Sequence, residues 1–275
     1  MRLLGGEVRK LVRRPASFVT LGIQLAIVAL IYVAVAVSYA NGPTTTTGSG
    51  AAARAGIRLL LTFPTAYGGS LGLVTGLGGL LALAFGGAAA GADWGWGMVK
   101  VAVARGESRT RYILAKLVAV ELFVAVGLIV AFVVAVVAAL GAATYAGIAT
   151  SGLTDSETLA GLPEQLARGY LGMAEQAAIG FAIATVARSQ LAGLGAGIAL
   201  YFVEQFATIF LADIVKYFPF HVAQSALHVT VSVGGSGNGL TTPLDPGVSV
   251  ALVAAYLVIA AIVSVGVVER AEISG

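Results

Sequence analysis

Long apolar stretches, separated by short polar or glycine-rich segments, dominate the pattern of this chain. About 20 consecutive apolar residues are needed to cross a bilayer as an α-helix, and six stretches meet or nearly meet that length. The runs do not alternate between apolar and polar residues, so helices are the expected spanning elements. We predict spans at residues 17–39, 67–92, 113–144, 168–187, 191–212 and 248–268.

The composition agrees with this pattern. The chain is 58% hydrophobic and 11% charged, whereas soluble domains average roughly 45–50% apolar and about 25% charged residues. No stretch carries enough charge to coat a water-facing surface, so residues 1–275 are expected to form a single all-α membrane domain. The sequence has no cysteine, which excludes disulfides, thiolate catalysis and cysteine-ligated metals.

The distribution of lysine and arginine predicts the orientation. Most of these residues lie before the first predicted span, between the second and third, and after the fourth and sixth, whereas four lie on the other side: Arg54, Arg58, Arg168 and Lys216. Both termini are therefore expected in the cytoplasm. The same distribution accounts for the net charge of +3 without a nucleic-acid partner.

The first forty residues have a second interpretation, because a basic start, an apolar run and Val37-Ser38-Tyr39-Ala40 imitate a signal peptide. The apolar run is longer than a signal segment needs, so we interpret it as the first span. Before it, apolar residues at helical spacing are interrupted by Pro15. This pattern predicts a short amphipathic helix in the headgroups, with an unstructured basic tail as the alternative. The charged residues of this segment are Glu7, Arg9, Lys10, Arg13 and Arg14.

The connections on the outer side differ in character. Residues 41–50 predict a flexible loop, 51–63 a second interfacial helix, and 147–165 a solvated loop. Residues 217–221 and 227–233 are apolar but too short to span, so we expect broken segments that dip into the membrane and return before the last span. A flexible glycine-rich turn is expected at 234–239.

Charge, aromatic residues and glycine gather in one segment, residues 91–116, between the second and third spans. An ionisable cluster is costly in hydrocarbon, so this segment is expected in water, in the headgroups or against a partner protein. The chain has no G-x-x-x-x-G-K-[ST] motif. If ATP drives this protein, another subunit must bind the nucleotide.

With a basic N-terminal helix, six spans, a charged second connection and broken segments before the last span, the chain resembles the membrane subunits of ABC-2 type transporters. In that family the second connection carries an acidic residue, Gly-Thr, apolar residues, Pro, Ser-Arg and a lysine that opens the third span. Here Asp93, Gly97-Met98, Ser108-Arg109 and Lys116 occupy comparable places. Met98 stands in place of the usual threonine, and no proline precedes Ser108.

The resemblance implies a permease subunit of an ATP-driven exporter in the plasma membrane. Two permease copies, identical or related, would work with two ATPase subunits that bind ATP and Mg²⁺, while this chain itself would bind no cofactor. The residues implied to couple to the ATPase are Asp93, Trp94, Trp96, Lys100, Arg105, Glu107 and Arg109. Alternatively, the tryptophans form an aromatic belt, and Arg105, Glu107 and Arg109 form a solvated face. The apolar interior favours a small hydrophobic or amphipathic substrate.

Three glutamates lie inside predicted spans: Glu121, Glu175 and Glu204. An intramembrane carboxyl is costly and usually faces a cavity or the bundle interior, so these residues are candidates for a translocation pathway. The alternative is a hydrogen-bonded structural acid. Glu121 lies about two turns into its predicted span and could reach the headgroups, whereas any partner of Glu175 or Glu204 must come from another span.

The two histidines, His221 and His228, are interpreted as packing residues, because no further metal ligand is evident nearby. Two other functions compete with the exporter. The first is a proton-coupled carrier that uses the three glutamates, although no internal repeat supports it. The second is an intramembrane hydrolase with Ser70 as nucleophile, although Ser70 lacks a G-x-S-x-G context.

Overall fold

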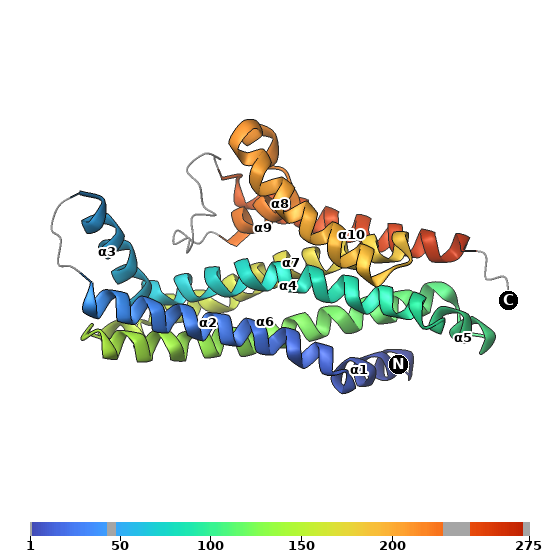
Figure 1. The fold of residues 1–275 in the computed structure, drawn as a ribbon, viewed down its shortest axis with the longest axis horizontal. Helices are drawn as coiled ribbons and strands as arrows, with labels where there is room; N and C mark the ends of the chain where they lie inside the picture. Colours follow the sequence, from blue (N-terminus) through green and yellow to red (C-terminus); the bar gives the residue numbers. More distant parts are fainter. Residues whose placement is uncertain (1, 43–47, 228–242, 272–275) are drawn as a thin grey trace.

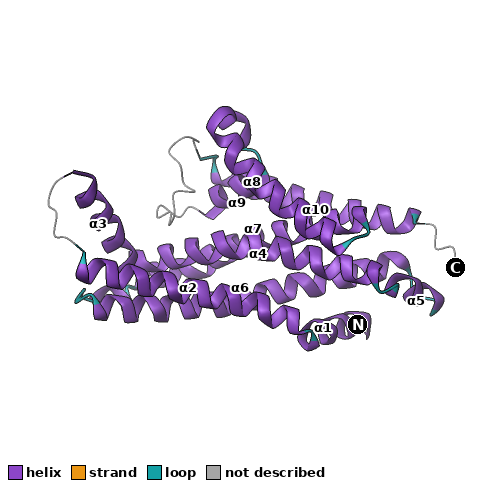
Figure 2. Ribbon diagram, in the orientation of Figure 1, coloured by secondary structure: helices purple, strands orange, loops and turns teal. Residues whose placement is uncertain are grey.

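The computed structural model describes residues 2–42, 48–227 and 243–271, and in these ranges it contains helices and no strand (Figure 2). The first helices are α1 (Arg2–Arg13), α2 (Pro15–Asn41), α3 (Gly48–Leu61), α4 (Thr65–Gly95), α5 (Met98–Ala104) and α6 (Arg109–Tyr145). After a short 3₁₀ turn at Ser151–Thr154 follow α7 (Ser156–Ala187), α8 (Gln190–Val215), α9 (Pro219–Leu227) and α10 (Pro246–Arg270).

Six of these helices are long and apolar enough to cross a membrane: α2, α4, α6, α7, α8 and α10. Each contains one predicted span, so the all-α, six-span fold class is confirmed. The start of α1 and the end of α10 lie at the same end of the molecule, together with α5 (Figure 1). We call this end, which also holds most of the arginines and lysines, the basic end; the charge distribution predicts that it faces the cytoplasm.

The fourth spanning helix begins earlier than the sequence predicted. Residues 147–165 were expected as a solvated loop, but α7 starts at Ser156. Asp155 caps it, because its Oδ2 accepts a hydrogen bond from the backbone N–H of Thr158 at 2.9 Å. The side chain of Thr158 donates to the same oxygen at 2.5 Å, and these two bonds hold the pKa of Asp155 below its usual range.

Helices α4 and α7 form the centre of the bundle (Figure 1). In the most apolar 18-residue stretch of each of these two helices, 67% of the residues are buried. The corresponding share is 17% in α2, α8 and α10. The two central helices approach closely where they lack side chains. A Cβ on Gly86 would collide with the carbonyl of Ala177, and one on Gly180 with the carbonyl of Leu83. Small residues at such crossings favour dispersion contacts between helices in a membrane.

The segment before the last span is broken, as predicted. Helix α8 departs from helical geometry at Leu211, and α9 then packs against α7 and α10. Figure 1 shows α8 leaving the bundle at an angle before the chain turns back into α9. Most of the predicted 227–233 segment, the 234–239 turn and His228 lie outside the described residues.

At the end opposite the basic end, α3 begins at Gly48, three residues before the predicted interfacial helix. Arg54 of this helix donates to the carbonyl of Gly42 at 3.3 Å and lies over the ring of Tyr39 at 4.4 Å. These contacts join α3 to the end of α2. Residues 43–47 of the predicted loop lie outside the described ranges.

Candidate functional site

A group of charged side chains is buried at the basic end, where α1 packs against α6. Glu7 of α1 is 3% exposed, and its carboxylate lies 3.4 Å from Nζ of Lys116 and 2.5 Å from Nζ of Lys10. The predicted amphipathic helix is therefore confirmed as a helix, but its acid faces α6. Of the other predicted basic residues of this segment, Arg9 and Arg13 are exposed, and Arg14 is half-buried.

Asp93, near the end of α4, completes this group. It is 2% exposed, and its carboxylate accepts hydrogen bonds from the Tyr112 hydroxyl and from Nζ of Lys116, the latter at 2.5 Å. Arg14 lies 3.4 Å from its other oxygen. We call Glu7, Lys10, Arg14, Asp93, Tyr112 and Lys116 the charged cluster. It joins α1, α4 and α6, so the geometry assigns Asp93 to holding these helices together and not to direct contact with a partner.

Helix α5 lies between the two halves of this cluster in sequence and extends beyond it at the basic end (Figure 1). Left-handed glycines bound it on both sides, Gly97 at φ 64° and Gly106 at φ 80°, where other residues would be strained. Trp96 is 67% exposed, and the side chains of Lys100, Arg105 and Glu107 are exposed as well. These four predicted coupling residues therefore form an accessible surface.

The other two predicted coupling residues, Trp94 and Arg109, are less exposed and contact neighbouring helices. Arg109 donates to the carbonyls of Glu269 and Ala271, at 3.0 and 2.9 Å, and so binds the end of α10. Trp94 is half-buried, and the guanidinium of Arg188 lies 5.2 Å from its ring centre. Both side chains thus join the second connection to neighbouring helices at the basic end.

The three glutamates of the predicted spans lie at similar distances from the basic ends of their helices. Glu121 is twelve residues from the start of α6, Glu175 twelve from the end of α7, and Glu204 fourteen from the start of α8. At 1.5 Å per residue these positions are roughly 18–21 Å from the basic end of each helix. Helix α6 begins four residues before the predicted third span, so Glu121 lies about three turns from the start of the helix.

Their environments differ. Glu204 is fully buried, and its carboxylate accepts hydrogen bonds from the backbone N–H groups of Phe220 and His221, at 3.3 and 2.7 Å. It also lies 2.7 Å from Nδ1 of His221. By contrast, the carboxylate oxygens of Glu121 and Glu175 are shielded and have no hydrogen-bond partner among the described residues.

The Glu204–His221 pair was not predicted: a partner of Glu204 was expected on another span, whereas His221 lies in the short helix α9. His221 was interpreted as a packing residue, but its ring bonds Glu204 through Nδ1, and its Nε2 lies 3.2 Å from the hydroxyl of Thr208. The sequence separation of 17 residues shows no periodicity that would join the two side chains. The available signal was the break after α8, since the free N–H groups at the start of α9 need an acceptor.

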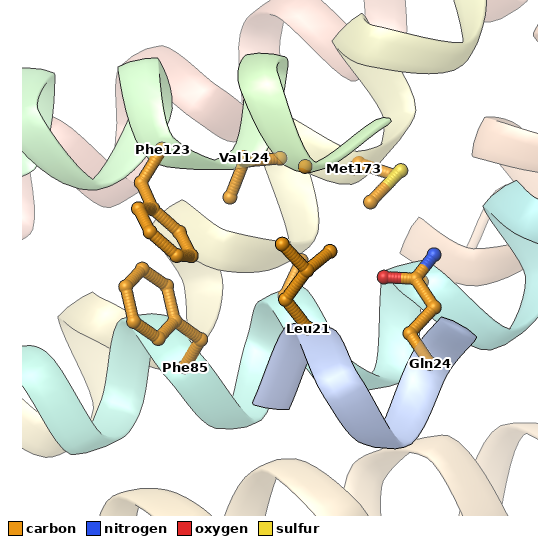
Figure 3. Close-up of a pocket in the computed structure, with 9 residues that line it drawn as sticks. Leu21, Gln24, Phe85, Phe123, Val124 and Met173 are labelled. Carbon is orange, nitrogen blue, oxygen red and sulfur yellow. The ribbon is translucent and has the colours of Figure 1, made fainter. Parts of the chain in front are cut away.

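One cavity among the helices is small. A cavity of about 30 Å³ lies between α2, α4, α6 and α7 and is lined by Leu21, Gln24, Phe85, Phe123, Val124 and Met173 (Figure 3). Gln24 donates to the carbonyl of Val74 at 3.1 Å, and Phe85 stacks on Phe123 with ring centres 4.8 Å apart. This volume holds about two water molecules, whereas ligand sites usually measure about 300–1,000 Å³.

The geometry supports neither an intramembrane hydrolase nor a metal site. Ser70 is buried, and its hydroxyl forms a 2.7 Å hydrogen bond with that of Tyr32, which joins α4 to α2. Nothing in this contact resembles an activated nucleophile. In the described part of the chain, no three metal-ligating side chains come together.

A family model described as "Protein of unknown function (DUF2705)" matches residues 74–274. The chain belongs to this family. No curated protein matches the chain. The matched range of the DUF2705 family begins within α4 and includes Asp93, Lys116 and the three intramembrane glutamates, whereas α1 lies before it.

Proposed function

We propose that this chain is the membrane-spanning permease subunit of an ABC-2 type exporter in the plasma membrane. In this proposal a separate ATPase binds ATP and Mg²⁺, and two permease copies, identical or related, form the transport unit. The exposed surface of α5 and its flanks, with Trp96, Lys100, Arg105 and Glu107, docks on the ATPase. One observation above all supports the proposal: α5 lies in the chain between Asp93 and Lys116, two members of the charged cluster.

The mechanical argument follows from the cluster's position. Asp93 lies just before α5 and Lys116 shortly after it, and the two side chains bond each other at 2.5 Å. Lys116 also reaches Glu7 on α1. Because a buried ion pair resists separation, a displacement of α5 is passed to α1, α4 and α6 together. A surface docked on a moving ATPase would therefore tilt three helices as a unit.

The transport path is proposed to lie between two copies of the chain. The interior cavity of about 30 Å³ is too small for a substrate. Helix α8, in contrast, exposes large apolar side chains, including Phe206 at 66% and Phe210 at 81%. A small hydrophobic or amphipathic substrate suits walls of this kind.

The test is copurification from the native host in mild detergent, with proteins identified by mass spectrometry. We expect a P-loop ATPase in stoichiometric amount with the wild-type chain and its loss from the variants Trp96→Ala and Arg105→Ala. Arg58→Ala is the matched control, because Arg58 is an exposed arginine on α3 at the opposite end. If the folded wild-type chain brings down no ATPase, the exporter proposal is rejected.

A second candidate, a proton-coupled carrier, is favoured by one observation: the carboxylates of Glu121 and Glu175 are buried and have no hydrogen-bond partner in the part of the chain that the structure describes. An unpaired carboxyl in a membrane is most readily accommodated as its neutral, protonated form. Transport that stops when the proton gradient collapses, continues without ATP and is lost in Glu175→Gln would support this candidate. Transport that follows ATP and survives Glu175→Gln would exclude it.

A further inference from the structure

An open pocket of about 490 Å³ lies at the basic end, between the end of α4 and the turn from α7 to α8. The residues that decide its chemistry are Trp96, Arg188, Ser189, Leu191 and Leu194. None of the nine described residues that line it is acidic. The pocket is therefore positive and large enough for a small ligand.

Its charge comes from Arg188, which follows α7 in a left-handed conformation at φ 51°. The guanidinium lies 5.2 Å from the ring centre of Trp94, and no described carboxylate lies within ion-pair distance of it. Arg14 lies similarly over Trp96, at 4.8 Å. Arg14 is already paired with Asp93, so Arg188 is the arginine whose donors remain for a ligand. Stacking on an aromatic face leaves the edge of a guanidinium, with its N–H donors, available to an anion.

An apolar stripe leads from the pocket along α8. Leu191 and Leu194 line the pocket, and Ile198 and Phe202 follow at helical spacing. Leu191 is 82% exposed, Ile198 39% and Phe202 51%. Because α8 is a spanning helix, this stripe runs from the basic end into the depth of the hydrocarbon.

We propose that this pocket binds the phosphate headgroup of an anionic phospholipid, with an acyl chain along the stripe on α8. A cation without an acidic neighbour selects a negative group, and the adjoining apolar stripe selects one attached to a hydrocarbon chain. Tryptophan and arginine at this depth are the side chains expected at headgroups. Free inorganic phosphate carries the same negative charge as the headgroup but has no acyl chain to lie along the stripe. The proposal does not depend on the exporter function.

The chain offers a direct reporter, because Trp94 and Trp96 are its only tryptophans. The full-length protein is reconstituted in phosphatidylcholine bilayers in which part of the lipid carries brominated acyl chains, which quench nearby tryptophan. Brominated phosphatidylglycerol and brominated phosphatidylcholine are compared at equal mole fractions. We expect phosphatidylglycerol to be preferred by about tenfold, as one charge-assisted contact allows. Equal quenching by the two lipids would overturn the proposal, and this arm requires no variant.

The role of Arg188 is tested with two variants. Arg188→Asn removes the charge with a residue that tolerates a left-handed backbone, and it should abolish the preference. Arg188→Lys should keep most of it. Arg270→Asn removes an exposed arginine at the same end, outside the pocket, and should change nothing. A preference that persists in folded Arg188→Asn protein contradicts the proposal. Displacement of phosphatidylglycerol by millimolar inorganic phosphate would reassign the pocket to a free anion and also overturn the lipid assignment.

Discussion

Two regions of this molecule bury carboxylates, and the regions differ in whether the carboxylates have partners. At the basic end, Glu7 and Asp93 are each bound by Lys116 and a second basic side chain. At mid-depth, Glu121 and Glu175 have no partner among the described residues. Paired charges contribute to structure, whereas an unpaired buried carboxyl costs stability and is retained for another reason.

Glu204 stands between these two cases. It lies about as far from the basic end of its helix as Glu175, yet it accepts two backbone hydrogen bonds from α9 and lies 2.7 Å from Nδ1 of His221. The depth of a carboxyl in the bilayer therefore does not decide whether it is structural. The decisive factor is whether a neighbouring helix begins there and offers free backbone N–H groups, as α9 does at Phe220 and His221.

The largest expected effect comes from breaking the charged cluster with Lys116→Met. This change leaves Asp93 and Glu7 buried without their shared cation, which should cost about 3–5 kcal/mol of stability. The measurement is reversible unfolding in mixed detergent micelles. Arg105→Met, at an exposed position on the same end, should change stability by less than about 0.5 kcal/mol. Equal effects of the two substitutions would show that the cluster is not structural.

A smaller effect is expected from Glu204→Ala, which removes the acceptor for the start of α9. Hydrogen bonds to a charged group contribute about 1.5–3 kcal/mol, so α9 should detach from its site. Because the chain has no cysteine, Ala226→Cys provides a single label in α9, at a position that is 1% exposed. Maleimide should react with it slowly in the parent and rapidly after Glu204→Ala. Unchanged reactivity would indicate that packing alone holds α9.

The comparison is sharpened by Glu175→Gln, for which we expect a stability change of less than about 1 kcal/mol. The carboxyl has no hydrogen-bond partner among the described residues, so its replacement breaks no contact, and a neutral amide is no harder to bury. The measurement is the same unfolding experiment as for Lys116→Met. A loss as large as that of Lys116→Met would mean that Glu175 is paired after all.

The smallest effect concerns Asp155, which lies outside the spanning helices. Hydrogen bonds from Thr158 hold its pKa below the usual range, so its stabilising contribution is present above the ordinary pKa of an aspartate. That contribution is lost as the pH falls through the lowered value in the folded state. The unfolding midpoint of Asp155→Ala should therefore be lower than that of the parent at neutral pH, and the two should converge in acid. A difference independent of pH would exclude the cap as its source.

Much of the fold could be predicted from the chain alone. Apolar run length places all six spanning helices, and the helical spacing of apolar residues before Pro15 places α1. The start of α7 was missed because Asp155 and Thr158 are polar and resemble a loop, although together they cap a helix. A helix cap of this kind is present in the sequence, but a prediction based on hydropathy alone does not detect it.

Of the candidate site, the sequence by itself determined which residues carry charge and that the segment around Asp93 must leave the hydrocarbon. Only the tertiary structure decided the partners. Lys116 meets Glu7 across 109 residues, and Glu204 meets His221 after the break at Leu211. Hydrophobic run length is a local property fixed by bilayer thickness, whereas the pairing of buried charges depends on which helices pack side by side.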